Sequence, residues 1–332
     1  MQEGKRIAVL GGGSWATAIM KMLLENNDHV SWWMRNNSAI EHLKKYHHNP
    51  NYIQSIEFNM DKIFLSSNMQ EVVDRSDYII VCIPSAFIDG TFKSLKPEGM
   101  KDKVLISAIK GIIGEYDSIP ARYLHKEFRT PYENIGIICG PCHAEEVAME
   151  RLSYLTIACP NDKHAQFIAD NLATRYIKTM TSRDVFGAET AAVLKNVYAV
   201  ASGICHGLSY GDNFQAVLIS SALREMRDFV DALHVVDRDI ASSAYLGDLL
   251  VTCYSPYSRN RTFGTMVGKG YSVKWTTIEM NMVAEGYYAV KGIHEMNKKF
   301  KVDMPIAEAV YRILYEKISP VVEMRILADQ LK

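Results

Sequence analysis

The stretch RIAVLGGGSWATA (residues 6–18) joins a short apolar run to three glycines and the start of a helical pattern. The apolar run predicts a strand over 6–10, and TAIMKMLLE (residues 17–25), which continues from the end of this stretch, predicts a helix. Between them stands G-x-G-x-x-A: Gly11 permits a tight turn, Gly13 lets backbone approach a pyrophosphate, and Ala16 permits close helix–strand packing. The helix N-terminus would present N–H groups and a positive dipole end to phosphates. This order of features predicts a dinucleotide-binding domain.

Apolar and β-branched runs recur along the first half of the chain. Further strands are predicted at 30–34, 78–83, 103–108, 135–139, 154–159 and 176–180. Most of these runs are continuously apolar, which is typical of strands covered on both faces. Helical patterns separate several of them, and strand–helix alternation favours a doubly wound, mostly parallel sheet. We therefore expect an α/β, Rossmann-like N-terminal domain.

The pattern changes near Asp184. The segment DVFGAETAAVLKNVYAVASGICHGL carries small and apolar residues at helical spacing, and convincing strands are no longer found. Helical patterns continue over 211–233, 304–316 and 320–331. The sequence thus predicts a dinucleotide-binding Rossmann-like domain over residues 1–183 and an all-helical substrate-binding and catalytic domain over residues 184–332.

Length, charge and cysteine content limit the classes of protein that fit. At 332 residues the chain is long enough for two domains with separate cores. Its formal net charge of −1 predicts no general attraction to nucleic acid or to a membrane surface. No apolar run approaches the roughly 18–20 residues that span a bilayer, and no signal-peptide pattern is found. Six scattered cysteines, four of them in apolar runs, favour reduced thiols and a cytoplasmic location. No metal site is predicted.

The residues after the second predicted strand bear on the choice of cofactor. A site specific for NAD would usually place Asp or Glu here, because a carboxylate binds the ribose hydroxyls. This chain has Arg35 and Asn36 instead, and a guanidinium can hold a 2′-phosphate. A solvated turn arginine is the alternative. The sequence therefore favours NADP, with NAD use also open.

Two lysines stand where a positive charge suggests a function. Lys110 follows the strand predicted at 103–108, and ligands of open α/β sheets bind at the carboxyl ends of strands. Lys195 interrupts the small, apolar helix ETAAVLKNVYAVASG, where a charge is costly unless a partner or ligand receives it. The alternatives are a surface lysine at position 110 and, at position 195, an amine that reaches solvent.

Two stretches of the second half add polar groups of other kinds. YLGDLLVTC places the carboxylate of Asp248 among apolar residues. SRNRT concentrates hydrogen-bond donors at Ser258, Arg259 and Asn260, and arginine suits bidentate capture of phosphate or carboxylate. A solvated loop is the alternative for this second stretch.

Seven motifs follow one another in an order and at spacings that resemble one known family. They are GGGSWATA, SAIKG, CGPCHAEEVA, LKNVYAVASG, LGDLLVTC, SRNR and AEGYYAVK. Over nearly its whole length the chain resembles the bacterial NAD(P)-dependent glycerol-3-phosphate dehydrogenases. The resemblance implies an oxidoreductase that interconverts dihydroxyacetone phosphate plus NAD(P)H and sn-glycerol 3-phosphate plus NAD(P)⁺, which supplies a precursor for phospholipid synthesis.

The resemblance also implies roles for individual residues. Lys195 would donate and accept the proton, Asp248 would orient the Lys195 side chain, and Lys110 would add positive potential. With the two glycines of the turn, the cofactor contacts would be Gly11, Gly13, Ser14, Trp15, Arg35, Lys110, Ala144, Arg259, Val283 and Glu285. The substrate contacts would be Lys110, Gly140, Cys142, Lys195, Asp248, Ser258, Arg259 and Asn260. The long apolar helices are compatible with a homodimer.

The chain departs from the usual family spelling in three places. Ala16 stands where a third glycine is common, and Ala284 stands where valine usually precedes Glu285. In the motif usually spelled GPSFA, Cys142 replaces serine and His143 replaces phenylalanine. The cysteine puts a hydroxyl contact at this position in doubt, although a backbone N–H contact would survive.

The CGPC of residues 139–142 is also the spelling of a thiol–disulfide redox site. A thioredoxin-type motif belongs to a compact domain and usually follows Trp, whereas Ile138 precedes the motif here, so redox function is disfavoured. Two other interpretations are a hydroxy-acid or ketopantoate-type dehydrogenase, whose substrate carboxylate Arg259 would bind, and a non-catalytic dinucleotide sensor. Lys195 and Asp248 argue against the sensor, which needs neither.

Overall fold

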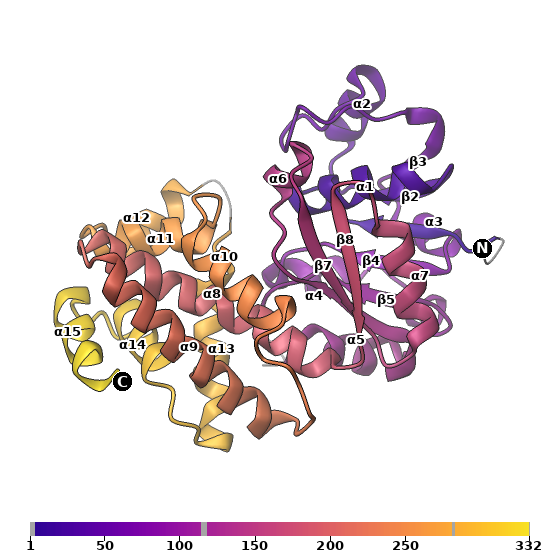
Figure 1. The fold of residues 1–332 in the computed structure, drawn as a ribbon. Coiled ribbons are helices and arrows are strands. Elements are labelled where there is room, and N and C mark those ends of the chain that lie inside the picture. Colours follow the sequence, from indigo (N-terminus) through magenta and orange to yellow (C-terminus); the bar gives the residue numbers. More distant parts are fainter. Residues whose placement is uncertain (1–3, 114–117, 281–282, 332) are drawn as a thin grey trace. The chain divides into compact units, whose positions relative to one another are not determined.

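The computed structural model describes residues 4–113, 118–280 and 283–331 (Figure 1). The chain forms two compact units. The Rossmann unit consists of Met1–Ile109 and Pro120–Val185, and the helical unit consists of Lys110–Ile119 and Phe186–Lys332. The segment Lys110–Ile119, which follows the fifth strand, therefore belongs to the helical unit, and the chain then returns to the Rossmann unit. A single domain boundary at 183/184 does not include this excursion.

One eight-stranded sheet forms the centre of the Rossmann unit. Its strands are β1 Ile7–Leu10, β2 Val30–Trp33, β3 Ile63–Ser66, β4 Tyr78–Val81, β5 Val104–Ser107, β6 Ile135–Cys139, β7 Ser153–Ala158 and β8 Ile177–Ser182. Their spatial order is β3-β2-β1-β4-β5-β6-β7-β8, and every neighbouring pair is parallel except β6 with β7. The order reverses between β1 and β4, which confirms the predicted doubly wound sheet and defines the switch point where such folds bind ligands.

Each predicted strand is present, and one further strand was not predicted. This strand, β3, lies at the edge of the sheet beside β2, and its side chains are only half-buried. An edge strand needs less apolar sequence than a central one because part of it faces solvent. The run of apolar residues in β3 is correspondingly short, so the pattern there is weak.

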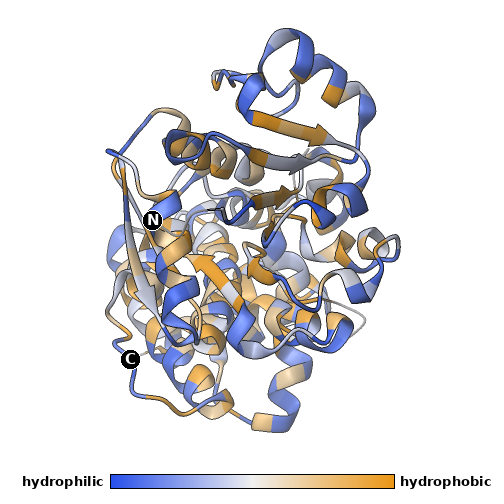
Figure 2. Ribbon diagram, turned by 90° about the vertical axis from the view of Figure 1, so that its right-hand side faces the viewer, coloured by the Kyte–Doolittle hydropathy of each residue, from blue (hydrophilic) through white to orange (hydrophobic). Residues whose placement is uncertain are grey.

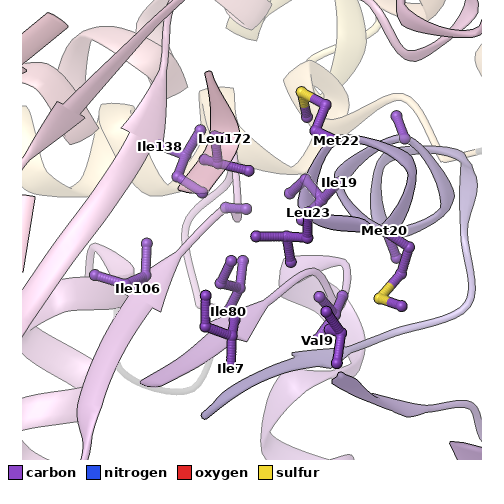
Figure 3. Packing of buried hydrophobic residues seen from close by; sticks show 14 of the residues in the cluster. Ile7, Val9, Ile19, Met20, Met22, Leu23, Ile80, Ile106, Ile138 and Leu172 are labelled. Atoms are coloured by element: carbon purple, nitrogen blue, oxygen red, sulfur yellow. The ribbon is translucent and has the colours of Figure 1, made fainter. Parts of the chain in front are cut away.

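Helices cover the sheet of the Rossmann unit. They are α1 Ser14–Asn26, α2 Asn37–Tyr46, α3 Met69–Asp74, α4 Ile88–Phe92, α5 Pro120–Phe128, α6 Ala144–Ala148 and α7 Asp162–Leu172. The core lies where α1 and α7 meet the sheet, as Figure 3 shows for residues from β1, β4, β5 and β6. Their side chains are buried almost completely, among them Ile7, Ile19, Leu23, Ile80, Ile106 and Leu172. This packing fixes α1, and with it the glycine turn, against the carboxyl end of β1.

The helical unit contains eight α-helices within its described residues. They are α8 Val185–Gly207, which starts at the last residue of the Rossmann unit, α9 Asp212–Leu233, α10 Asp248–Tyr254, α11 Arg259–Gly268, α12 Val273–Glu279, α13 Glu285–Phe300, α14 Pro305–Leu314 and α15 Pro320–Gln330. The predicted helices over 211–233, 304–316 and 320–331 correspond to α9, α14 and α15. Figure 2 shows the helices with alternating blue and orange stretches, the pattern of elements with one buried side.

The longest helix, α8, is buried along almost its entire length. Two of its glycines face α11 so closely that a Cβ atom at Gly203 would lie 2.8 Å from the backbone nitrogen of Thr265. In the same way Gly264 of α11 faces α8, because a Cβ there would lie 2.9 Å from the backbone nitrogen of Ile204. Glycines on both helices therefore let the two backbones come into direct contact. Among the described residues, no helix is both long and apolar enough to cross a bilayer.

Candidate active site

The glycine turn lies between β1 and α1. Gly11 has φ +137°, and a Cβ there would lie 2.7 Å from the carbonyl oxygen of Cys82, so both backbone angle and space require glycine. Gly13 is the N-cap of α1, and a Cβ there would meet no atom within 4 Å. Ser14 is the buried first residue of the helix, and Trp15 follows it half-buried. The turn thus leaves open space at a helix N-terminus, which fits a pyrophosphate.

Arg35 lies just beyond the carboxyl end of β2. Its side chain is exposed and forms no ion pair with the residues that the structure describes. The next residue, Asn36, caps α2 by accepting a hydrogen bond of 2.9 Å from the backbone N–H of Ser38. Because β2 neighbours β1 and is parallel to it, Arg35 belongs to the same edge of the sheet as the glycine turn. A guanidinium without an ion-pair partner at this edge of the sheet can bind a phosphate.

The CGPC segment connects β6 to α6. Gly140 has φ +112°, and a Cβ there would lie 2.9 Å from the carbonyl oxygen of Tyr154. Cys139 and Cys142 are both buried, and Cys139 donates a hydrogen bond of 3.6 Å to the carbonyl of Thr156. Ala144 is the first residue of α6 and is buried. The glycine is therefore required by the backbone.

Lys195 and Asp248 form a buried ion pair in the helical unit. Their side chains are 3% and 2% exposed, respectively. Lys195 comes from the middle of α8, whereas Asp248 is the first residue of α10. A π-helical turn over Ser243–Gly247 directly precedes Asp248, and such turns are common at functional sites. An unpaired charge at either position would be strongly unfavourable, so the pair explains how a lysine can stand in this apolar helix.

Side-chain amides link the segments around this ion pair. Asn196, next to Lys195, donates a hydrogen bond of 2.8 Å to the carbonyl of Lys110. Its Oδ1 accepts a bond of 2.9 Å from Asn260, and the Oδ1 of Asn260 accepts one of 2.9 Å from the backbone N–H of Gly286. This chain of bonds ties the residues after β5 to α8, α11 and α13.

Ser258 and Arg259 form the start of α11. Ser258 is the buried N-cap, and its hydroxyl oxygen accepts a bond of 3.3 Å from the N–H of Arg261. Arg259 is the first residue of the helix and is half-buried. At the start of α13, Glu285 is the first helical residue, and Val283 precedes it by two positions.

Each unit therefore assembles its own share of the predicted site. The Rossmann unit holds Gly11, Gly13, Ser14, Trp15, Arg35, Gly140, Cys142 and Ala144, and the helical unit holds Lys110, Lys195, Asp248, Ser258, Arg259, Asn260, Val283 and Glu285. Hydrogen bonds and the ion pair connect Lys110, Lys195, Asp248 and Asn260 through their neighbours. No described hydrogen bond ties Val283 to this group. Asn196 was not assigned a role from the sequence, although it is an amide in the same apolar helix as Lys195.

Comparisons with known proteins agree on one family. The family model of the NAD-dependent glycerol-3-phosphate dehydrogenase N-terminus matches residues 6–165, and that of the C-terminus of the same enzymes matches residues 184–325. A protein of Salinibacter ruber named glycerol-3-phosphate dehydrogenase [NAD(P)+] 2 is 33% identical over 315 residues, which cover 95% of this chain and 91% of that protein. A similarly named protein of Bacillus pumilus is 34% identical over 325 residues, covering 96% and 93%.

Solved structures give the same result. A crystal structure of glycerol-3-phosphate dehydrogenase from Coxiella burnetii superposes with a TM-score of 0.90 at 26% sequence identity, covering 97% of this chain and 98% of that one. Its likeness extends over both units. The sequence motifs, the doubly wound sheet, the helical unit and these relatives together show that the chain belongs to the NAD-dependent glycerol-3-phosphate dehydrogenase family.

Proposed function

We propose that the protein interconverts dihydroxyacetone phosphate and sn-glycerol 3-phosphate with NAD(P)H and NAD(P)⁺ as the redox pair. The observation that carries this proposal is the buried ion pair of Lys195 and Asp248 in a chain of this family. A buried lysine held by one carboxylate is suited to proton transfer, and a binding module would gain nothing from it. The product supplies the glycerol backbone for phospholipid synthesis.

Lys195 acts on the carbonyl oxygen of the substrate. The nicotinamide cofactor, when bound, supplies the hydride that reduces the ketone carbon. As negative charge develops on the oxygen, the ammonium of Lys195 stabilises it and donates the proton, and in the reverse direction the amine accepts it. Asp248 holds Lys195 in place and balances its charge. Lys110, bonded through its carbonyl to Asn196, adds a second positive charge on the same unit.

The substrate phosphate binds at the start of α11. Arg259 offers a guanidinium there, and a guanidinium binds phosphate with paired hydrogen bonds. The hydroxyl oxygen of Ser258 accepts the capping bond of the helix, so its O–H remains able to donate. One N–H of Asn260 is engaged by Asn196, which leaves the other for the substrate. Binding the phosphate positions the ketone for reaction.

The dinucleotide binds the Rossmann unit at the glycine turn. The open space beside Gly13 and the N-terminus of α1 fit a pyrophosphate. Arg35 supports a preference for NADPH, because its exposed guanidinium stands where the 2′-phosphate is recognised in this fold. The segment between β6 and α6 contains Gly140 and Cys142, and Ala144 begins α6. Backbone atoms of these residues contact the ligands.

We also propose a cytoplasmic location and a homodimer. Cys159, Cys205 and Cys253 are buried and form no disulfide, which suits a reducing compartment. The dimer is supported by apolar side chains that α15 exposes, including Val322 and Ile326.

A turnover assay with purified protein tests the proposed reaction. Oxidation of NADPH and NADH is followed with dihydroxyacetone phosphate, and a panel of keto acids is run in parallel. We expect turnover with dihydroxyacetone phosphate and none above background with the keto acids. Lys195→Ala is expected to lower kcat by at least ~100-fold, which is the range of one general acid, while cofactor affinity stays near that of the wild type.

Two further variants separate chemistry from folding. Lys291, an exposed lysine of α13, provides the control variant Lys291→Ala, which should keep full activity. Because Lys195→Ala leaves Asp248 buried without its partner, the double variant Lys195→Met with Asp248→Asn removes both charges and should fold while remaining inactive. Turnover within a few-fold of wild type in either Lys195 variant would remove this residue from the mechanism.

A further inference from the structure

Asn49 is a fully buried polar residue that lies beside the glycine turn. It has none of the roles described above. Its side chain is 0% exposed. The amide nitrogen Nδ2 donates to the carbonyl oxygen of Gly12 at 3.1 Å and to the hydroxyl of Thr17 at 2.9 Å. The amide oxygen Oδ1 accepts from the backbone N–H of Asn51 at 3.0 Å. All three of these bonds lie within the Rossmann unit.

The neighbours fix which way this amide points. Thr17 has a single hydroxyl proton, which it donates to the carbonyl of Gly13 at 2.9 Å, so its oxygen can only accept from Asn49. The N–H of Asn51 requires an acceptor, which is the amide oxygen of Asn49. The bonds therefore run in one direction, from Asn49 through Thr17 to Gly13, with a second branch from Asn49 to Gly12.

The segment that carries Asn49 is itself held in place. The backbone N–H of Phe58 donates to the carbonyl of His47 at 2.8 Å, which closes the loop between α2 and β3. The ring of Phe58 contacts that of Trp32 edge to face at 5.3 Å, and the Nε1 of Trp32 donates to the carbonyl of Gly11 at 2.7 Å. All three carbonyls of the glycine turn are thus held by donors of the Rossmann unit.

The direction of each carbonyl determines the direction of the next N–H. In a trans peptide the C=O of one residue and the N–H of the following residue point in opposite directions. Asn49, by holding the oxygen of Gly12, turns the N–H of Gly13 away from itself. By the same geometry Thr17, on the oxygen of Gly13, turns the N–H of Ser14 away. A Cβ at Gly13 would meet no atom within 4 Å, so there is open space for a ligand beside this part of the turn.

We propose that Asn49 is a positioning residue for the pyrophosphate of the dinucleotide: it keeps the carbonyl of Gly12 out of the phosphate site and aims the N–H of Gly13 into it, and by its bond to Thr17 it supports the same arrangement at the next peptide. A carbonyl that turned toward the phosphates would place its partial negative charge against theirs. The inference rests on the proposed binding of the dinucleotide at this turn. Since NADH and NADPH share the pyrophosphate, Asn49 supports the binding of both equally.

The test measures dissociation constants of NADH and NADPH by calorimetry on the full-length protein. In Asn49→Ala both constants should rise about tenfold, as expected for the loss of one effective hydrogen bond. At saturating cofactor, kcat should stay within about twofold of wild type, and the KM for dihydroxyacetone phosphate should not change, because the helical unit is untouched. A role in stability alone would lower the melting temperature without raising either dissociation constant.

Asn26 offers a matched control at the other end of α1. Its side-chain amide, like that of Asn49, donates two hydrogen bonds, here to the carbonyls of Asn171 at 3.1 Å and Ala173 at 2.7 Å. Asn26→Ala removes two donated side-chain bonds from the same unit, as Asn49→Ala does, and the affinity for both cofactors should stay at the wild-type value.

A second pair of variants decides the question if Asn49→Ala does not fold. Thr17→Val keeps the shape of the side chain but loses the hydroxyl between Asn49 and Gly13, whereas Thr17→Ser keeps the hydroxyl. Weak binding of both cofactors in Thr17→Val and normal binding in Thr17→Ser support the proposal. Equal binding by these two variants, or wild-type binding by folded Asn49→Ala, overturns it.

The wild-type protein separates this inference from the proposed function. If the wild type binds neither dinucleotide, both the proposed function and this inference fail. If the wild type binds and oxidises NADPH while the variants bind as tightly, only the role of Asn49 fails.

Discussion

Among the buried ionisable residues of the helical unit, Lys195 and Glu225 are accommodated in two different ways. Lys195 is paired with Asp248. Glu225, 4% exposed on α9, instead accepts the backbone N–H groups of Ile306 and Ala307 at 2.9 and 3.0 Å, and so caps α14 from a neighbouring helix. Burial raises the pKa of Glu225 to about 8, even though these two N–H groups and the Tyr198 hydroxyl lower it.

Glu225 should make the protein less stable as pH rises. In the unfolded chain this group ionises near 4.5, whereas in the folded protein its pKa is about 8. Between these values the folded state holds a proton that the unfolded state has lost, so the free energy of unfolding falls by at most about 1.4 kcal/mol per pH unit from this group. Above about pH 8 both states are ionised and the dependence on this group ends.

Urea unfolding of the wild type and of Glu225→Gln from pH 5 to 8.5 measures this dependence of the free energy of unfolding on pH. The variant cannot titrate, and its amide accepts only one of the two N–H groups, so it should be less stable than wild type at pH 5. The difference between the two proteins should shrink as pH rises. A difference that stays constant over this range would show that Glu225 does not hold a proton in the folded protein.

Arg35 should discriminate between the two cofactors. Arg35→Ala removes the exposed guanidinium after β2, so the KM for NADPH should rise about tenfold while the KM for NADH changes little. Steady-state kinetics with each cofactor measure the effect, and Arg151→Ala, another exposed arginine of the Rossmann unit, is the control. Equal losses with both cofactors would mean that Arg35 does not bind the 2′-phosphate. The two variants therefore differ in their expected effects: Asn49→Ala weakens the binding of both cofactors, whereas Arg35→Ala affects NADPH alone.

At the scale of helices, the contact between α8 and α11 positions two parts of the site. Lys195 and Asn196 lie on α8, and Arg259 and Asn260 begin α11. Glycines on both helices allow the backbones to approach, and the bond of 2.9 Å between Asn260 and Asn196 forms beside this contact. The distance between these helices therefore sets the distance between the proposed proton donor and the proposed phosphate site.

Gly264→Ala should disturb that distance. The added Cβ would lie 2.9 Å from the nitrogen of Ile204, and backbone atoms of a buried helix cannot yield easily. We expect a loss of about 1–3 kcal/mol in the free energy of unfolding, which outweighs the better helix propensity of alanine. The KM for dihydroxyacetone phosphate should rise as well.

Gly90→Ala is the matched control for this change. Gly90 lies inside α4, and a Cβ there meets nothing within 4 Å, so the substitution should be neutral or slightly stabilising. Denaturation curves and steady-state kinetics of both variants provide the comparison. Equal stability of the two variants would contradict the close helix contact.

At the scale of the whole molecule, the proposed homodimer makes a prediction about α15. Val322 and Ile326 lie one turn apart on this helix and are 52% and 45% exposed. Sedimentation velocity should give twice the chain mass of 37.5 kDa for the wild type. Val322→Glu with Ile326→Glu should shift the protein to the chain mass, because charges cannot be buried in an apolar interface. A wild-type protein that sediments as a monomer excludes the dimer.

The fold could be predicted from the sequence to a large extent because its signals are local. A strand, three glycines and a helix in succession can form only a few structures, and the strands β1, β4 and β5 are apolar enough to be recognised alone. The edge strand β3 and the excursion of residues 110–119 were not predicted, since each depends on contacts with distant parts of the chain.

The glycine turn, the lysine in an apolar helix and the family to which the motifs belong could all be recognised in the sequence, because they depend on residue type and short spacing. The residues that complete the turn and the site around the lysine became apparent only in the folded protein. Asn49 reaches Gly12 across 37 positions and Asn260 reaches Asn196 across 64. Bonds of this kind leave no periodic trace in the sequence, since their partners are brought together only when sheet and helices pack.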